Sequence, residues 1–128
     1  MPVTHRWLAA SFAVVTGQED DTKTRPSVNW AALATAVDTL VVLMGSRALP
    51  EVARTLIAHG RAAETPVALI HDAITPRQVT VTTTLGALLD AATAPTLPAP
   101  MIAVIGDVVS LRASLGLAAR VPAAAVGA

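Results

Sequence analysis

The residues of this chain that could do chemistry stand directly after short apolar runs. One group is Met44 with Gly45, a second is the segment at residues 71–74, and a third is Gly106 with Asp107. Glycine lets a ligand approach the backbone closely, and the polarisable thioether of methionine suits a flat ring. In open α/β sheets, ligands bind beyond the carboxyl ends of the strands. The pattern indicates a ligand cleft at these strand ends, with the alternative that the methionine is core and the glycines are turns.

Other kinds of chemistry find little support. The three histidines stand alone at positions 5, 59 and 71, which argues against a metal site. The absence of cysteine excludes disulfides, thiolate ligands and a cysteine nucleophile. Ser46 follows a glycine, but the Gly-x-Ser-x-Gly spacing of a serine hydrolase is missing.

Charge and hydropathy limit the partners. Nine Lys and Arg balance nine Asp and Glu, without a block of like charge, so no nucleic-acid partner is expected. No apolar run reaches the roughly 18 residues that span a bilayer, so no membrane partner is expected either. The apolar stretch at residues 7–15 is similar to a signal peptide but lacks its cleavage site, and we interpret it as a buried strand. The absence of cysteine predicts a reducing compartment, the cytoplasm.

The elements that must position these residues alternate between strand and helix patterns. We predict an α/β fold with a largely parallel or mixed sheet of about five strands flanked by helices. The strands are expected at residues 11–16, 39–44, 66–71, 78–83 and 101–106. The fourth alternates polar and apolar residues and is expected near an edge of the sheet.

Three helices are predicted between the strands. The clearest begins at Ser46 as N-cap and stops at Gly60, with an apolar stripe at i, i+3, i+4 and i+7 spacing. A shorter one follows Asn29 and another follows Thr84. Their predicted buried residues are Trp30, Leu33 and Val37, and Leu85, Leu88, Leu89 and Ala92. Residues 18–27 are predicted to be a surface loop, residues 1–115 one domain, and residues 116–128 a flexible tail.

Several strings, in order, resemble uroporphyrinogen-III C-methyltransferases of the tetrapyrrole methylase family. They include Pro-Val-Thr-His-Arg at residues 2–6, Val-Val-Thr-Gly at 14–17 and Thr-Leu-Val-Val-Leu-Met-Gly at 39–45. Thr-Pro-Val-Ala-Leu-Ile at 65–70, Thr-Pro-Arg-Gln at 75–78 and Ile-Ala-Val-Ile-Gly-Asp-Val-Val at 102–109 continue the series. The resemblance covers residues 2–115 and concerns the second of the family's two domains.

The resemblance implies a function that this chain cannot complete alone. The family binds S-adenosyl-L-methionine between its two domains and methylates two ring carbons of uroporphyrinogen III, giving precorrin-2 for sirohaem and cobalamin. The glycine-rich turn and the acidic and basic residues of the first domain have no counterpart here. The resemblance therefore implies a methyltransferase half that is inactive without a separate N-terminal domain, and a homodimer.

Cofactor residues follow from the matching positions. Met44 matches the family methionine that contacts the cofactor, with Gly45 beside it, and Ala68 lies on the strand whose end lines the adenine pocket. Ala73 stands where the family usually has a cofactor-contacting glycine, and Ile74 replaces a hydroxyl residue. If Ala73 adopts φ > 0, the strain is about 1–2 kcal/mol.

Substrate residues are implied at the amino terminus. His5 and Arg6 match the stretch next to the tetrapyrrole, and a guanidinium binds the carboxylates of such a substrate well. The alternative for Arg6 is a surface cation. Trp7 and Gln18 depart from the family, which has glycine and histidine there.

Two hypotheses follow. The first is the methyltransferase half. The second is a non-catalytic α/β module for dimerisation or regulation, and the replacements at positions 73 and 74 motivate it.

Overall fold

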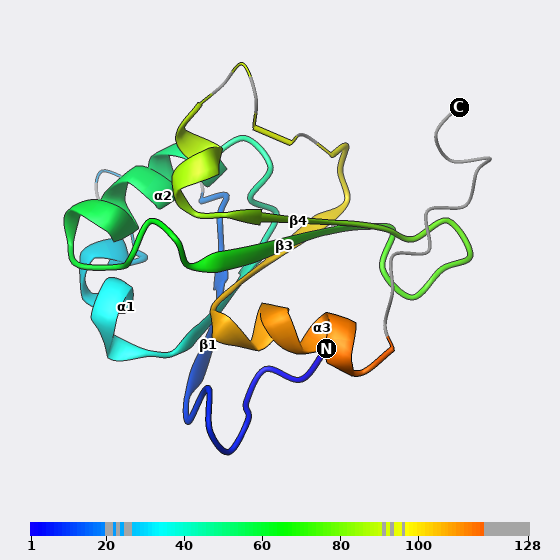
Figure 1. Cartoon of the computed structure of the whole chain (residues 1–128). Coiled ribbons are helices and arrows are strands. Elements are labelled where there is room, and N and C mark those ends of the chain that lie inside the picture. Colours follow the sequence, from blue (N-terminus) through cyan, green and yellow to red (C-terminus); the bar gives the residue numbers. More distant parts are fainter. Residues whose placement is uncertain are drawn as a thin grey trace.

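A computed structural model describes residues 1–19, 22, 24, 27–90, 92, 94–95 and 97–116. It contains one mixed sheet of five strands, as predicted (Figure 1). The strands are β1 (Phe12–Thr16), β2 (Thr39–Leu43), β3 (Pro66–His71), β4 (Val79–Thr84) and β5 (Met101–Ile105). Each lies within one residue of its predicted bounds, because each apolar run is limited by polar, proline or glycine residues.

The strand order β1-β2-β5-β3-β4 decides which strand ends meet. β1 and β2 are parallel, and β5 is antiparallel to both β2 and β3. The carboxyl ends of β1, β2 and β3 therefore lie side by side with the starts of β4 and β5. Each such border of the sheet, where strands begin or end, is called an edge below. β4 is one of the two outermost strands of the sheet, which confirms the prediction from its alternating pattern.

One face of the sheet is covered by α1 (Trp30–Ala36), α2 (Leu49–Ala58) and the 3-10 helix η1 (Gly86–Leu89) (Figure 1). The apolar stripe of α2 is buried as predicted, at Leu49, Val52, Ala53 and Leu56. Burying a leucine or valine side chain contributes about 1.5–3 kcal/mol, so this layer holds most of the core.

The helix boundaries show where local signals fail. α1 follows Asn29 as predicted, and the Asn29 side chain caps the helix by accepting from the Ala32 amide at 3.0 Å. Ser46 is not the N-cap of α2, because the Ala48 and Leu49 amides both donate to the Gly45 carbonyl at 3.0 Å and form a turn before the helix.

The third predicted helix is only a 3-10 turn. It buries Leu85 and Leu88 as predicted, whereas Leu89 and Ala92 are exposed. Residues 117–128 of the predicted tail lie outside the described residues, as does half of the predicted loop at residues 18–27. No helix in the described ranges is long and apolar enough to cross a membrane.

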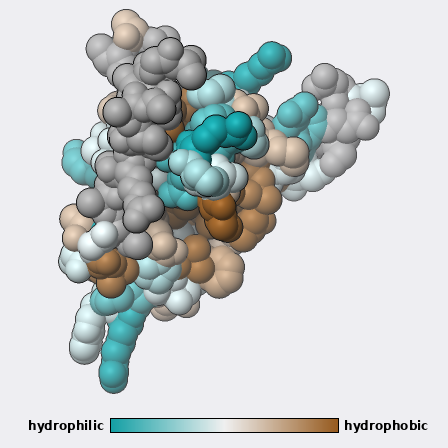
Figure 2. All heavy atoms as spheres, turned by 90° about the vertical axis from the view of Figure 1, so that its right-hand side faces the viewer, coloured by the Kyte–Doolittle hydropathy of each residue, from teal (hydrophilic) through white to brown (hydrophobic). Residues whose placement is uncertain are grey.

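The second face of the sheet is covered incompletely. The 3-10 helix η2 (Asp107–Ser110) and α3 (Leu111–Ser114) pack beside β3, together with the amino-terminal residues Met1 and Ala9. On β1, Phe12 and Val14 point to this face and are 50% and 53% exposed. Figure 2 shows the side of the molecule away from α1 and α2, where apolar surface lies open between hydrophilic side chains.

Arg61 fastens the edge of the sheet where β2 and β3 begin. Gly60 ends α2 with φ +107°, as its predicted role as a stop signal requires, and turns the next residue back toward α1. The Arg61 guanidinium donates to the carbonyls of Ala34, Val37 and Asp38, the first two at 3.2 and 2.7 Å. Burial lowers the pKa of Arg61, while two nearby carboxylates act in the opposite direction. The cation thus satisfies carbonyls that α1 leaves unpaired at its end.

Candidate functional site

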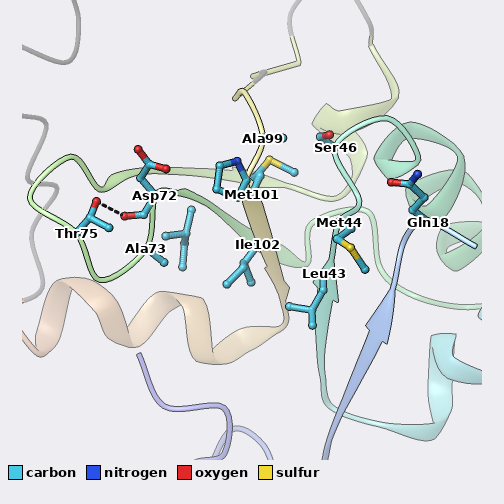
Figure 3. Close-up of a pocket in the computed structure, with 12 residues that line it drawn as sticks. Gln18, Leu43, Met44, Ser46, Asp72, Ala73, Thr75, Ala99, Met101 and Ile102 are labelled. Atoms are coloured by element: carbon cyan, nitrogen blue, oxygen red, sulfur yellow. Dashed lines mark hydrogen bonds between the residues drawn. The ribbon is translucent and has the colours of Figure 1, made fainter.

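A cavity of about 670 Å³ lies at the edge where β1, β2 and β3 end. The turn after β2 and the loop after β3 form its two sides, and the start of β5 lies between them (Figure 3). This volume is typical of sites for small molecules and cofactors.

The turn after β2 presents Met44 to the cavity. Met44 has φ +53° and is 63% exposed, so its side chain is neither core nor sealed. The turn packs tightly on the end of β1: a Cβ on Gly17 would lie 2.4 Å from the Gly45 Cα, and one on Gly45 would lie 2.7 Å from Val42 Cγ1. Both residues must therefore be glycine, and buried Gly45 supports Met44 from behind rather than lining the cavity.

The loop after β3 is held by its own hydrogen bonds. The Thr75 hydroxyl and amide donate to the Asp72 carbonyl at 2.7 and 3.2 Å, and the Ile74 amide donates to Gln78 Oε1 at 2.9 Å. Asp72 and Ile74 have φ of +48° and +66°. A β-branched residue in this region is an outlier that costs about 1–3 kcal/mol.

Ala73 lines the cavity but does not carry the predicted strain. Residues with positive φ stand on either side of it, and Ala73 is not one of them. The condition for strain at Ala73 is therefore not met, because the turn places its unusual torsions at Asp72 and Ile74. Met44 and Ala73 do line one cavity, so the structure brings the loops after β2 and β3 together, while the binding of a cofactor by these residues stays a prediction.

Other predicted site residues are not brought to the cavity. Ala68 is fully buried, and Ile70, two residues further along the same face of β3, lines the cavity instead. His5 and Arg6 precede β1, outside the cavity lining. The His5 amide and carbonyl pair with Ala9 in a tight turn, and the Arg6 guanidinium stacks 5.5 Å from the Trp7 ring.

Gly106 and Asp107 were wrongly expected at the same edge as Met44. Because β5 is antiparallel to β2, its carboxyl end lies at the opposite edge, and its first residues Met101 and Ile102 line the cavity. Sequence reasoning missed them because a buried apolar run does not reveal its direction.

Gln18 and Asp72 also line the cavity. Asp72 belongs to the segment at residues 71–74 that was predicted to border the cleft, but no role was assigned to it, and Gln18 was not predicted as a site residue. For Gln18, the available signal was its position two residues after the end of β1. The Asp72 carboxylate lies 3.5 Å from His71 Nε2 and 3.4 Å from Arg77 Nε. The described residues contain no group of three or more side chains able to hold a metal ion.

Comparison with known proteins decides the family. The sequence model of the tetrapyrrole (corrin/porphyrin) methylases matches residues 1–89, more than half of the chain. The chain belongs to the tetrapyrrole methylase family. The match includes both loops that bound the cavity, whereas the part of the lining at residues 99–102 lies outside the matched residues.

Relatives narrow the resemblance. A uroporphyrinogen-III C-methyltransferase from Priestia megaterium is 42% identical over 110 residues, covering 86% of this chain and 46% of the relative. A siroheme synthase from Stutzerimonas stutzeri is 41% identical over 115 residues, covering 90% of this chain and 24% of the relative. The tetrapyrrole methylase chain described here thus spans about half the length of the first relative and a quarter of the second.

A solved structure has the same fold. The uroporphyrin-III C-methyl transferase from Thermus thermophilus, complexed with S-adenyl homocysteine, superposes with a TM-score of 0.75 at 32% identity. The superposition covers 86% of this chain and 48% of that one. This tetrapyrrole methylase chain therefore resembles one half of a larger methyltransferase.

Proposed function

We propose that this chain is one half of an S-adenosyl-L-methionine-dependent uroporphyrinogen-III C-methyltransferase and forms one wall of its methyl-donor site. The product is precorrin-2, on the route to sirohaem and cobalamin, and the chain is inactive until a first domain supplies the opposite wall. The proposal includes a cytoplasmic location, which the absence of cysteine favours.

The observation that carries the proposal is the exposed Met44 side chain, which shares an open cavity with Ala73. The cavity combines an apolar surface from Leu43, Ile70 and Ile102 with a few polar groups, as sites for nucleoside-like ligands do. The donor, when bound, supplies a methyl group on a sulfonium. Met44 and Ala73 are the residues of this chain that we propose to hold it.

The role of this half is binding and orientation. Holding two reactants in line contributes several kcal/mol to a transfer between them. The lining of the cavity offers apolar contacts that exclude water. It also offers one carboxylate, that of Asp72. His5 and Arg6 are proposed to meet the tetrapyrrole carboxylates only in the assembled enzyme, because they lie outside this cavity.

Isothermal titration with S-adenosylhomocysteine tests the proposal. We expect weak heat from the chain alone and tight binding after addition of the complementary half of the Priestia megaterium relative. Met44→Ala should lower the affinity about 5–10-fold through lost apolar contact. Leu115→Ala is the matched control, because Leu115 is 55% exposed but lies outside the cavity.

A second candidate is the non-catalytic module for dimerisation or regulation. The exposed Phe12 and Val14 on the outermost strand β1 favour it, because an apolar sheet face is commonly covered by a partner. The module predicts a dimer by size exclusion and no titration heat with or without the complementary half. Turnover by the 128-residue chain alone would contradict both candidates.

A further inference from the structure

The Asp72 carboxylate does not take part in the hydrogen bonds that shape its own loop. The hydrogen bonds that shape the loop go to the Asp72 carbonyl, from the amide and hydroxyl of Thr75. Within the described residues, the carboxylate accepts no main-chain hydrogen bond, and its partners are His71 and Arg77. An aspartate with φ of +48° often binds the main chain nearby, but here the side chain turns elsewhere.

Neither partner saturates this carboxylate. The His71 Nδ1 lies 3.0 Å from the Pro100 carbonyl, which can only accept, so Nδ1 carries the proton. The other ring nitrogen is 3.5 Å from Asp72, beyond the length of a good hydrogen bond. Arg77 is 81% exposed, and such surface pairs are weak because water screens them. A carboxylate has about four acceptor positions, so several are left for a ligand.

The position of Asp72 in the cavity determines which ligand groups its carboxylate can attract. Asp72 is the one ionisable side chain among the described residues that line the cavity, and it is only 18% exposed. Figure 3 shows it on the loop that faces Met44 across the cavity. A carboxylate accepts hydrogen bonds and attracts cations, but it repels acceptors. A partly buried carboxylate therefore selects ligands by the donors and positive charge that they carry.

We propose that Asp72 is a specificity-determining residue that binds a cationic or hydrogen-bond-donating group of the ligand in this cavity. The inference rests on the proposed methyl-donor site. S-adenosylmethionine carries a sulfonium, an ammonium and the neutral donors of its base and sugar, and each has the required chemistry. The Asp72 contact favours the charged donor over its anionic or acceptor-rich analogues.

Asp72→Asn isolates the charge. Asparagine tolerates the left-handed conformation and has nearly the same shape, so the loop and its main-chain hydrogen bonds are retained. We expect the affinity for the contacted group to fall about 5–20-fold, as for loss of a charge-assisted hydrogen bond. The measurement is NMR shift perturbation of the full chain, which detects binding at millimolar ligand.

Three probes locate the contact. A loss with adenosine, S-adenosylhomocysteine and S-adenosylmethionine places it at the base or sugar. A loss with only the last two places it at the amino-acid part, and a loss with S-adenosylmethionine alone places it at the sulfonium. Each of these results supports the proposal.

Arg77→Gln is the opposing variant. It removes a competing cation from Asp72, so the affinity for the contacted group should rise about 2–3-fold because this exposed pair is weak. An equal fall in Arg77→Gln and Asp72→Asn would indicate a disturbed loop and overturn the inference. Unchanged binding of all probes by Asp72→Asn would overturn it while the donor site stands. No perturbation in the wild-type chain would overturn the donor site as well.

Discussion

The two edges of the sheet use their polar groups in opposite ways. Where β2 and β3 begin, the Arg61 guanidinium and the Asp38 carboxylate are bound to the main chain. Where the same strands end, the Asp72 carboxylate makes only ion-pair contacts within the described residues. Met44 and Ile74 expose apolar side chains there in left-handed conformations. At the first edge the polar side chains are used in hydrogen bonds within the protein. At the second edge the side chains remain available to a ligand.

The difference indicates where the function lies. Strained torsions persist only where the surrounding structure fixes them, and they concentrate at ligand sites. Here they fall on both loops beside the cavity. The comparison predicts that removing the bound polar side chains at the Arg61 edge lowers the stability. Replacing the side chains of Asp72 or Ile74 at the cavity edge should leave the stability unchanged or raise it.

Arg61→Met should have the largest effect. Removing the guanidinium leaves the carbonyls of Ala34, Val37 and Asp38 without their donor, and we expect the free energy of unfolding to fall by about 2–4 kcal/mol. Urea denaturation followed by circular dichroism measures this change. Arg54→Met is the matched control, because Arg54 pairs with Glu51 alone among the described residues, on the exposed side of α2, and should contribute less than about 1 kcal/mol. Equal losses in the two variants would refute the special role of Arg61.

The strand edges also show what the sequence can and cannot predict. Strand positions followed from apolar runs bounded by polar, proline or glycine residues, and the stop of α2 followed from Gly60, because these are local properties. The direction of β5 depends on pairing between distant residues, so Gly106 and Asp107 were assigned to the wrong edge.

The candidate site was predictable only in outline. Met44 and Ala73 were found because they follow strands and match a family pattern, and the structure brings them to one cavity. Gln18 was missed, and Asp72 was included only as part of the segment at residues 71–74, because a single polar residue after a strand is common in any α/β protein. The burial of Ala68 depends on how η2 packs on β3, which no local pattern reveals.

Asp38→Ala removes a bound carboxylate from the edge where β2 and β3 begin. The Asp38 side chain accepts from the Ala10 amide at 2.8 Å, and its amide donates to the Ser11 hydroxyl at 3.0 Å, which fastens the start of β1. We expect a loss of about 1–2 kcal/mol and faster hydrogen exchange in β1. Asp72→Asn serves as the comparison at the other edge and should change the free energy of unfolding by less than about 0.5 kcal/mol. A larger loss from Asp72→Asn than from Asp38→Ala would reverse the comparison.

Ile74→Asn should have the smallest effect and the opposite sign. Ile74 is 97% exposed, so its side chain contributes almost no packing, and its main-chain bond to Gln78 is independent of the side chain. Asparagine adopts φ of +66° with less strain than a β-branched residue, so the free energy of unfolding should rise by about 0.5–1 kcal/mol.

Val14→Asn is the matched control for Ile74→Asn. Val14 is also an exposed apolar residue, but it lies in the extended strand β1, where asparagine is unfavourable, and this variant should lose stability. If both variants were stabilised, the gain would come from reduced exposed apolar surface and not from the torsion at Ile74. A gain confined to Ile74→Asn would mean that the loop holds isoleucine at a cost to stability, as expected for a residue retained for contact with a ligand or partner.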